Sequence, residues 1–399
     1  MPLVFLNLQL GIFIAPSLAF HNRIPVNETI EWSRGPAFGN VPVGAHVMRI
    51  AQVCHLWESV PPLQYGGTER VVAHLTEELT RLGHEVTLFA SGDSVTSARL
   101  SAVSPLAVRL YEGPLARDAF LALLQEKVLA QANQFDLIHS HLDFVGFPMA
   151  RRCPTPVVTT LHGRLDLPEL QPVYRLFDEQ VLISISDSQR RGWPYGNWHA
   201  TVHHGLPRDL YRCQSAPGRY LAFLGRMSPE KRPDAAIRLA IQVGLPLRMA
   251  AKIDPVDRDY FASVIRPRLD HPLIEYVGEI SDAQKQQFLG EAIATLCPYE
   301  PEPFGLVLIE SLACGTPVIA YRHGSFEEII VDGVTGFLCK DEREMETAVG
   351  EIGTLDRHQC RDDFERRFTA TRMAHQYLAA YHGMLDRCDQ LSRNSRLHA

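Results

Sequence analysis

The sequence predicts an α/β protein made of two Rossmann-like domains, each built on a parallel β-sheet. Short apolar segments alternate with amphipathic segments of helical period, which is typical of buried strands and the helices that cover them. This alternation stops in the aperiodic segment 206–218 and then starts again. With 399 residues, the chain is also too long for one ordinary hydrophobic core, which favours two domains.

The composition is that of a globular protein. Hydrophobic residues make up 46% of the chain and charged residues 21%, with a formal net charge of −7. No run of five like charges is present, so we expect no nucleic-acid partner. The eight cysteines form no C-x-x-C pair and mostly lie in apolar stretches, which predicts free thiols in a reducing compartment. We therefore expect a cytoplasmic protein without disulfides or a zinc site.

The first 47 residues do not fit the alternating pattern. Segment 3–20 is apolar enough to suggest a secretory signal, but no Lys or Arg precedes Arg23. Segment 21–47 is rich in Pro, Gly and Asn and has no period. We expect the folded protein to begin near Met48, with 1–47 an extension that is poorly ordered or comes from a miscalled start. Export is the alternative.

The first domain is expected to span 48–205. Its predicted strands are 49–54, 84–90, 135–141, 156–163, 181–186 and 199–205. Helices are expected at 67–83 and 115–133. In the first of these, apolar side chains recur at spacings of four, four and three residues on one face, and Gly83 ends the helix.

The second domain is expected to span 206–370. Its predicted strands are 220–225, 247–251, 273–278, 292–297, 317–320 and 336–339. Its predicted helices, including a last one that runs beyond the domain, are 229–243, 304–314, 342–351 and 357–388. Ligands of open α/β sheets bind beyond the carboxyl ends of the strands, so two such domains predict a cleft between them.

The segment YGGTER (65–70) joins a predicted strand to a predicted helix. Gly66 and Gly67 would let the backbone come close to a ligand, and the free N–H groups of the helix start favour an anion. The spacing is not G-x-G-x-x-G, and no acidic residue ends the next strand, so a dinucleotide site is poorly supported. A simple tight turn is the alternative.

The segment FLGRMSPEKRP (223–233) follows the first strand of the second domain. Arg226 and Lys231 flank a helix start at which Ser228 can cap and Pro229 fits the first position. Cations at a helix N-terminus oppose the helix dipole, so they suggest an anionic ligand such as a diphosphate. A solvated basic turn is the alternative.

The segment EPFGLVLIESLACGTPVIA (302–320) places two carboxylates at the ends of an apolar run. We expect a helix to start near Phe304, so that Phe304, Gly305 and Leu306 offer free N–H groups to an anion. Glu310 would share a face with Leu306 and accept hydrogen bonds from a vicinal diol such as a ribose. Glu302 would reach a different hydroxyl. A surface glutamate on an amphipathic helix is the alternative for Glu310.

Three further segments contain residues of chemical interest. His162 ends a β-branched strand and lies where sites of α/β sheets are found, although a structural role is also common for such a residue. The alternating histidines of 139–141 have no evident third metal ligand. The DRD segment 257–259 begins a helix, where acids are favoured in any case. We expect no metal site.

Taken together, GGTER, FLGRMSPEK and EPFGLVLIESLACGTPVIA resemble family 4 retaining glycosyltransferases (glycosyl transferases group 1), which have the GT-B fold. The resemblance covers nearly all of 48–388. It implies two Rossmann-like domains facing an interdomain cleft, with an acceptor domain (48–205) and a nucleotide-sugar donor domain (206–370). The family's last helix often crosses back to the first domain, as 371–399 could do here.

The resemblance also implies roles for individual residues. Arg226 and Lys231 would hold the donor diphosphate. Glu310 would bind the nucleotide ribose and Glu302 the transferred sugar. His162 would lie near the reacting face of that sugar.

The remaining implied contacts involve backbone. Phe304, Gly305 and Leu306 would support sugar and phosphate through their N–H groups. Gly67, next to Gly66, would approach the diphosphate from the first domain.

The expected function is transfer of a hexosyl group from a nucleotide diphosphate sugar, of the UDP-glucose or GDP-mannose type, to an acceptor hydroxyl with retention. The expected partners are that donor and a small-molecule or glycan acceptor, with at most peripheral membrane contact. No cofactor is expected beyond the donor substrate. The alternatives are a GT-B-type phosphorylase, a nucleotide-sugar epimerase and a NAD-type oxidoreductase.

Overall fold

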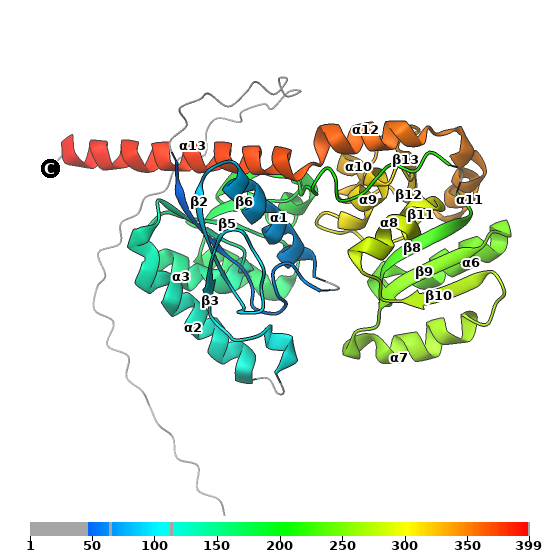
Figure 1. Cartoon of the computed structure of the whole chain (residues 1–399), viewed down its shortest axis with the longest axis horizontal. Helices are drawn as coiled ribbons and strands as arrows, with labels where there is room; N and C mark the ends of the chain where they lie inside the picture. The colour runs from blue at the N-terminus through cyan, green and yellow to red at the C-terminus, as the bar shows by residue number, and fades with distance from the viewer. Residues whose placement is uncertain (1–46, 64–65, 112–114, 217, 398–399) are drawn as a thin grey trace, which may run out of the picture. The chain divides into compact units, whose positions relative to one another are not determined.

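The computed structural model describes residues 47–63, 66–111, 115–216 and 218–397, all within one compact unit, Gly44–Ala399 (Figure 1). The predicted N-terminal extension lies outside these residues, apart from Val47.

The first sheet has seven strands in the order β3-β2-β1-β4-β5-β6-β7, and every neighbouring pair is parallel. The strands are β1 (Arg49–Val53), β2 (Glu85–Ala90), β3 (Arg99–Ala102), β4 (Leu137–Ser140), β5 (Val157–Thr160), β6 (Val181–Ser184) and β7 (Trp198–Thr201). The helices between them are α1 (Gly67–Arg81), α2 (Leu115–Gln131), α3 (Phe147–Arg152), α4 (Gln171–Leu176) and α5 (Asp187–Arg191).

The second sheet has six strands in the order β10-β9-β8-β11-β12-β13, again all parallel. The strands are β8 (Tyr220–Arg226), β9 (Leu247–Lys252), β10 (Ile274–Gly278), β11 (Ala292–Cys297), β12 (Val318–Tyr321) and β13 (Gly336–Cys339). Its helices are α6 (Pro233–Val243), α7 (Arg258–Tyr260), α8 (Asp282–Gly290), α9 (Leu306–Ala313), α10 (Phe326–Ile329), α11 (Glu342–Glu351) and α12 (Arg357–Arg367). The prediction of two Rossmann-like parallel-sheet domains is therefore confirmed.

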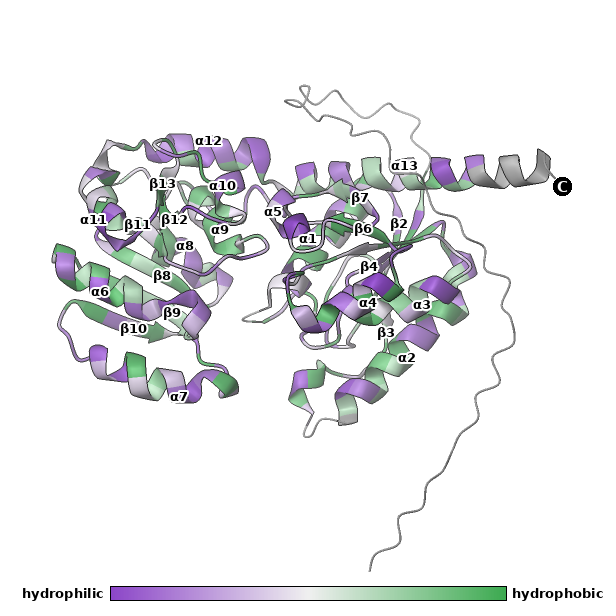
Figure 2. Ribbon diagram, turned by 180° about the vertical axis from the view of Figure 1, so that it is seen from behind, coloured by the Kyte–Doolittle hydropathy of each residue, from purple (hydrophilic) through white to green (hydrophobic). Residues whose placement is uncertain are grey.

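Both sheets are buried because helices cover their faces. Figure 2 shows hydrophobic colour along the strands of the second domain and hydrophilic colour on α12. In α1, the periodic side chains of Val71, Leu75 and Leu79 are fully buried. They pack with Ile50 of β1, so the 3.6-residue period predicted from the sequence does place one face of this helix on the sheet.

The last helix, α13 (Ala370–Leu397), packs against elements of the first domain although it follows the second in the chain (Figure 1). Met373, Tyr377 and Tyr381 are fully buried in a cluster with Ile50 and Val71. Their burial stabilises the return of the chain, since each large apolar side chain removed from water contributes about 1.5–3 kcal/mol.

Several predicted elements differ from those observed. The helix expected at 357–388 is two helices, α12 and α13, separated at Phe368 and Thr369. The helix expected from 229 begins at Pro233, because Arg232 adopts a left-handed conformation (φ 47°) after a short turn. Lys231 therefore precedes the helix instead of lying in its first turn. Strand β3 and the helices α3, α4, α5, α8 and α10 were not predicted.

The structure also bears on the state of the cysteines and on the presence of membrane-spanning helices. None of the eight cysteines, all of which lie among the described residues, forms a disulfide, and five of them are buried. Among the described residues, no helix combines the length and apolar character needed to cross a membrane.

Candidate active site

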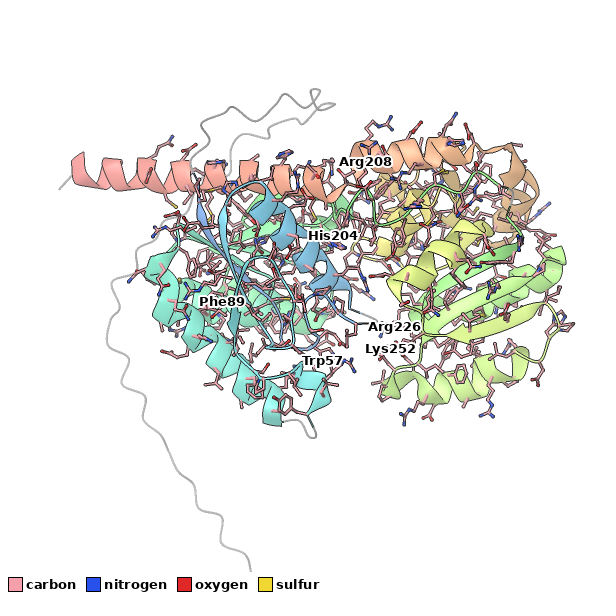
Figure 3. The ribbon with its side chains drawn as sticks, viewed as in Figure 1. Trp57, Phe89, His204, Arg208, Arg226 and Lys252 are labelled. Carbon is pink, nitrogen blue, oxygen red and sulfur yellow. The ribbon has the colours of Figure 1, made fainter. Side chains whose placement is uncertain are left out.

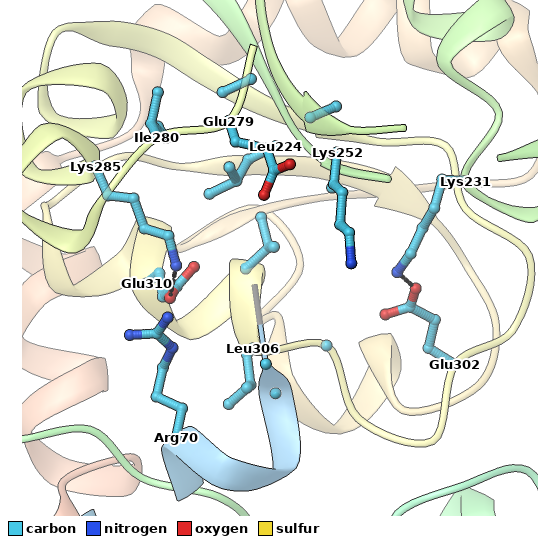
Figure 4. Close-up of a pocket in the computed structure, with 17 residues that line it drawn as sticks. Arg70, Leu224, Lys231, Lys252, Glu279, Ile280, Lys285, Glu302, Leu306 and Glu310 are labelled. Carbon is cyan, nitrogen blue, oxygen red and sulfur yellow. Dashed lines mark hydrogen bonds and ion pairs between the residues drawn. The ribbon is translucent and has the colours of Figure 1, made fainter. Parts of the chain in front are cut away.

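A cavity of about 180 Å³ lies where the carboxyl ends of β8 and β9 meet the starts of α1 and α9 (Figure 4). It is lined by Gly66, Gly67, Arg70, Leu224, Gly225, Lys231, Ala250, Ala251, Lys252, Glu279, Ile280, Lys285, Glu302, Gly305, Leu306, Val307 and Glu310. The lining comes from both domains and includes four cations and three carboxylates. Carboxyl ends of parallel strands are the usual ligand site of this architecture.

The first domain contributes two glycines and one arginine to this cavity. Gly66 precedes α1 and Gly67 begins it, as the sequence predicted. A Cβ at Gly66 would lie 2.7 Å from Cβ of Pro62, so a side chain there would displace the turn. At Gly67, an added Cβ would meet only Leu306 Cδ1, at 3.7 Å. The backbone is therefore exposed to the cavity, next to the unpaired N–H groups of the helix start.

The second domain contributes the start of α9, which lies two residues later than predicted. Gly305 caps the helix with φ of 107°, a conformation that favours glycine, and Leu306 is the first helical residue. Leu306 and Val307 line the cavity, whereas Phe304 does not. The Phe304 side chain is buried, with its ring 4.8 Å from that of His204. The prediction that the helix start includes Phe304 is therefore wrong, because the left-handed glycine separates that residue from the helix.

Lys231 and Glu302 form an ion pair within the cavity (Figure 4). The exposed fractions of their side chains are only 12% and 18%, so the pair is largely shielded from water. Lys231 also lies over the ring of Tyr299, with Nζ 4.4 Å from the ring centroid. Burial lowers the pKa of the Lys231 ammonium to about 7, while the contact with the Glu302 carboxylate favours the charged form.

Arg226 and Lys252 end the neighbouring strands β8 and β9, at paired positions of the ladder (Figure 3). Lys252 lines the cavity, and Figure 4 shows its ammonium group pointing into it. Arg226 is absent from the lining. Its guanidinium is bound by Glu230 and lies 3.3 Å from Asp254. The structure thus brings Lys252, which was not predicted, to the position expected of Arg226.

Glu310 is buried, with only 2% of its surface exposed, and its carboxylate accepts a hydrogen bond of 2.7 Å from Lys285 of α8. Lys285 also lies 3.4 Å from Asp282, which forms an ion pair with Arg70 of the first domain. Figure 4 shows Lys285 and Arg70 on either side of Glu310. The alternative of a surface glutamate is excluded. The apolar run accommodates this acid because a buried network of opposite charges surrounds it.

His162 does not line the cavity, but two ring contacts connect it to Phe304, the residue before Gly305 of the lining. Its ring stacks on His204, at 5.4 Å between centroids, and His204 in turn contacts Phe304. Its Nε2 is 2.9 Å from Nδ1 of His141, and its backbone N–H donates to Asp143 at 2.7 Å. Burial lowers the pKa of His162 to about 4, although Asp143 acts in the opposite direction. The imidazole is therefore neutral at pH 7.

Of the ten predicted site residues, seven line the cavity: Gly66, Gly67, Lys231, Glu302, Gly305, Leu306 and Glu310. Sequence reasoning missed Arg70, Lys252 and Lys285. Arg70 was inside the GGTER segment, and a cation at the end of the predicted strand 247–251 was a usable signal for Lys252. No local pattern pointed to Lys285, since its relation to Glu310 arises only from the packing of α8 on α9.

The fold and the site together define a two-domain α/β protein of the GT-B type, and comparison with known proteins agrees. Residues 65–224 match the model of Glycosyltransferase Family 4, and residues 215–361 match that of Glycosyl transferases group 1. The chain belongs to this glycosyltransferase family. This membership decides against the alternative of a NAD-type oxidoreductase.

Individual relatives support the same conclusion. The phosphatidyl-myo-inositol mannosyltransferase of Mycolicibacterium smegmatis is 28% identical, over 83% of this chain and 90% of its own length. The D-inositol 3-phosphate glycosyltransferase of Mycolicibacterium gilvum is 27% identical, over 73% and 78%.

Solved structures also resemble the chain. A glycosyltransferase of avilamycin A biosynthesis, AviGT4, is 25% identical and covers 85% of this chain and 98% of its own, with a TM-score of 0.64. The Anabaena protein HepE in complex with UDP-glucose is similar in fold, with a TM-score of 0.67 at 18% identity, over 84% of this chain and all of its own.

Proposed function

We propose that this glycosyltransferase moves a hexosyl group from a nucleotide diphosphate sugar to an acceptor hydroxyl with retention of configuration. The observation that carries the proposal is the arrangement of charge in the cavity. Lys231 and Lys252 stand at one end, and the Glu310 network stands at the other. A ligand that is anionic in its middle and carries hydroxyls on both sides matches this arrangement.

Each part of the donor has a matching group in this proposal. The diphosphate lies against Lys231, Lys252 and the helix starts at Gly67 and Leu306, which stabilise the charge that develops as it leaves. The ribose hydroxyls donate to Glu310. Glu302 accepts hydrogen bonds from the transferred sugar after Lys231 turns from it to the phosphate. Arg226, held by acids in the structure described here, would join the diphosphate only by exchanging those partners.

Retention follows in this proposal from attack on the same face of the sugar that the diphosphate leaves. The anomeric carbon becomes oxocarbenium-like, as in glycoside hydrolysis. The departing phosphate takes the proton of the acceptor hydroxyl, so no carboxylate nucleophile is required. The acceptor would lie against residues 162–175 of the first domain, and it would be a small molecule or a glycan.

A panel of nucleotide sugars tests the donor. UDP-glucose and GDP-mannose are the first candidates, because HepE binds the former and a relative is a mannosyltransferase. A donor that binds only the folded state raises Tm. At a donor concentration of about 100 times Kd, the folded state is stabilised by about 2.7 kcal/mol. The donor selected should then release its nucleoside diphosphate in the presence of an acceptor, and the anomeric configuration of the product reports retention. A panel in which no nucleotide sugar raises Tm or is consumed would contradict the proposal.

Donor affinity should fall as the pH rises above 7. The buried Lys231 has a lowered pKa, so it loses its proton as the pH rises through that value, and a diphosphate binds the protonated form. Binding coupled to one proton loses up to about tenfold in affinity per pH unit above the pKa of the free protein. Calorimetric titration of a nucleotide sugar between pH 6.5 and 9 measures this slope. The arginine of Lys231→Arg stays charged over this pH range, so the variant should show a flatter slope than the wild type. An equal slope in the wild type and the variant would show that another group causes the pH dependence.

A further inference from the structure

The partly exposed His162 is the first member of a row of hydrogen-bonded polar side chains that reaches α13. Nδ1 of His141 is 2.9 Å from Nε2 of His162, and Nε2 of His141 is 2.9 Å from the amide oxygen of Gln52. The amide nitrogen of Gln52 donates to the Tyr381 hydroxyl at 3.3 Å. Gln52, His141 and Tyr381 are fully buried. These three groups are shielded from bulk solvent, so each donor must find its acceptor within the row.

With the Gln52 amide in the orientation that it has in the structure, the direction of each hydrogen bond follows from the chemistry of the groups. The amide oxygen of Gln52 can only accept, so Nε2 of His141 carries its proton and donates. Burial, reinforced by His139 and His162, lowers the pKa of His141 well below its usual value, so this ring is neutral. Its Nδ1 is then bare and accepts, which requires His162 to donate from Nε2.

The other end of this row of hydrogen bonds agrees with this orientation of the Gln52 amide. The Tyr381 hydroxyl lies 2.7 Å from Nδ1 of His139, and Nε2 of His139 lies 2.7 Å from the Thr160 hydroxyl. Tyr381 thus donates to His139 while it accepts from the Gln52 amide. An amide turned the other way would place two donors, or two acceptors, against each other unless every proton in the chain moved.

We propose that Gln52 and His141 are positioning residues that hold His162 as its Nε2–H tautomer and leave Nδ1 as a hydrogen-bond acceptor for a hydroxyl of the bound sugar or acceptor. Nδ1 of His162 has no hydrogen-bond partner among the described residues. The role for Nδ1 rests on the proposed function, whereas the tautomer rests on the hydrogen bonds alone. Tyr381 belongs to α13, so the orientation of His162 in the first domain depends on the helix that follows the second domain.

The test reads the tautomer directly, without donor or acceptor. In the full-length protein labelled with ¹⁵N-histidine, long-range ¹H–¹⁵N spectra distinguish protonated from bare ring nitrogens. The His162 signals are those missing from the His162→Gln spectrum. We expect protonated Nε2 and bare Nδ1 in the wild type. A wild-type His162 protonated at Nδ1 overturns the proposal, whatever the activity of the enzyme.

Variants then test whether Gln52 imposes this tautomer. Gln52→Met removes the acceptor at similar volume, so His162 should show mixed or Nδ1–H signals, and kcat/KM should fall about 10- to 100-fold, as for other supporting partners of site residues. Tyr381→Phe frees the Gln52 amide to turn, and should shift the His162 signals in the same direction. If Gln52→Met does not fold, the same measurement is made on Tyr381→Phe.

Thr295→Val is the matched control. It removes an equally buried hydroxyl that forms a hydrogen bond of 2.7 Å with Ser311 in the second domain, away from the hydrogen bonds that connect His162 with Tyr381. The control should lower stability without changing the His162 signals or kcat/KM by more than about threefold. Unchanged His162 signals in both Gln52→Met and Tyr381→Phe would overturn the positioning role, even if the tautomer of the wild type is as expected.

Discussion

Lys231→Ala is expected to lower kcat by about 100- to 1,000-fold, the range found when one preorganised group that stabilises developing charge is removed. Lys231 is the cation nearest Glu302, and its burial makes its charge more effective than that of an exposed lysine. Release of nucleoside diphosphate from the selected donor, followed at saturating donor and acceptor, measures the effect.

A surface lysine provides the control for this variant. Lys340 has a side chain that is 75% exposed and lies 3.7 Å from Glu344, so Lys340→Ala should leave kcat within about twofold of the wild type. Lys231→Arg should retain more activity than Lys231→Ala because it keeps a cation. Equal kcat values for Lys231→Ala and Lys340→Ala would remove Lys231 from the mechanism.

Glu310→Gln is expected to have two large effects, one on stability and one on nucleotide binding. The substitution leaves Lys285 beside a neutral amide in a site that is largely closed to water. Breaking a buried pair costs about 3–5 kcal/mol when the remaining charge has no partner. Lys285 is 13% exposed and keeps Asp282 at 3.4 Å, so we expect a loss at the lower end of this range. Equilibrium unfolding in urea measures the loss of stability, and calorimetric titration with nucleoside diphosphate measures the loss of binding.

A double variant separates the two effects. Glu310→Leu combined with Lys285→Met replaces both charges by apolar groups of similar volume, which is often neutral for stability. We expect the double variant to regain most of the stability lost in Glu310→Gln but none of the nucleotide affinity. Recovery of both would show that Glu310 is only structural and that the ribose is bound elsewhere.

Much of the fold was predictable because its signals are local. Buried parallel strands appear as short apolar runs, and the face of α1 follows from the spacing of its leucines. The end of helix α12 at Arg367 was missed because the run 357–388 contains no Pro, and its capping signal is a single residue, Thr369, whose hydroxyl accepts a hydrogen bond of 3.2 Å from the N–H of Arg372. Strand β3, Arg99–Ala102, alternates too little to be recognised, and it is an edge strand with one neighbour.

Site residues were predictable where a local sequence pattern determines their position, and not where the packing of distant segments determines it. Glycines at helix starts and acids in apolar runs identified Gly66, Gly67 and Glu310. The choice between a ligand and a protein partner for Glu310 required α8, which carries Lys285. Likewise, Arg226 is bound by Glu230, which lies four residues later in the same segment, and by Asp254. The position of Asp254 follows from the loop after β9 and not from the sequence around Arg226.

In the proposed mechanism, Glu310 binds the ribose of a nucleotide whose diphosphate reaches Lys231. Calorimetric titration of the wild type and Glu310→Gln with the nucleoside diphosphate of the selected donor, and with its 2′,3′-dideoxy analogue, tests it most directly. Loss of the hydroxyls should weaken binding to the wild type about 10- to 100-fold, the value of hydrogen bonds to a charged group, and binding to Glu310→Gln by about threefold or less. The same loss of affinity in both proteins would contradict the account.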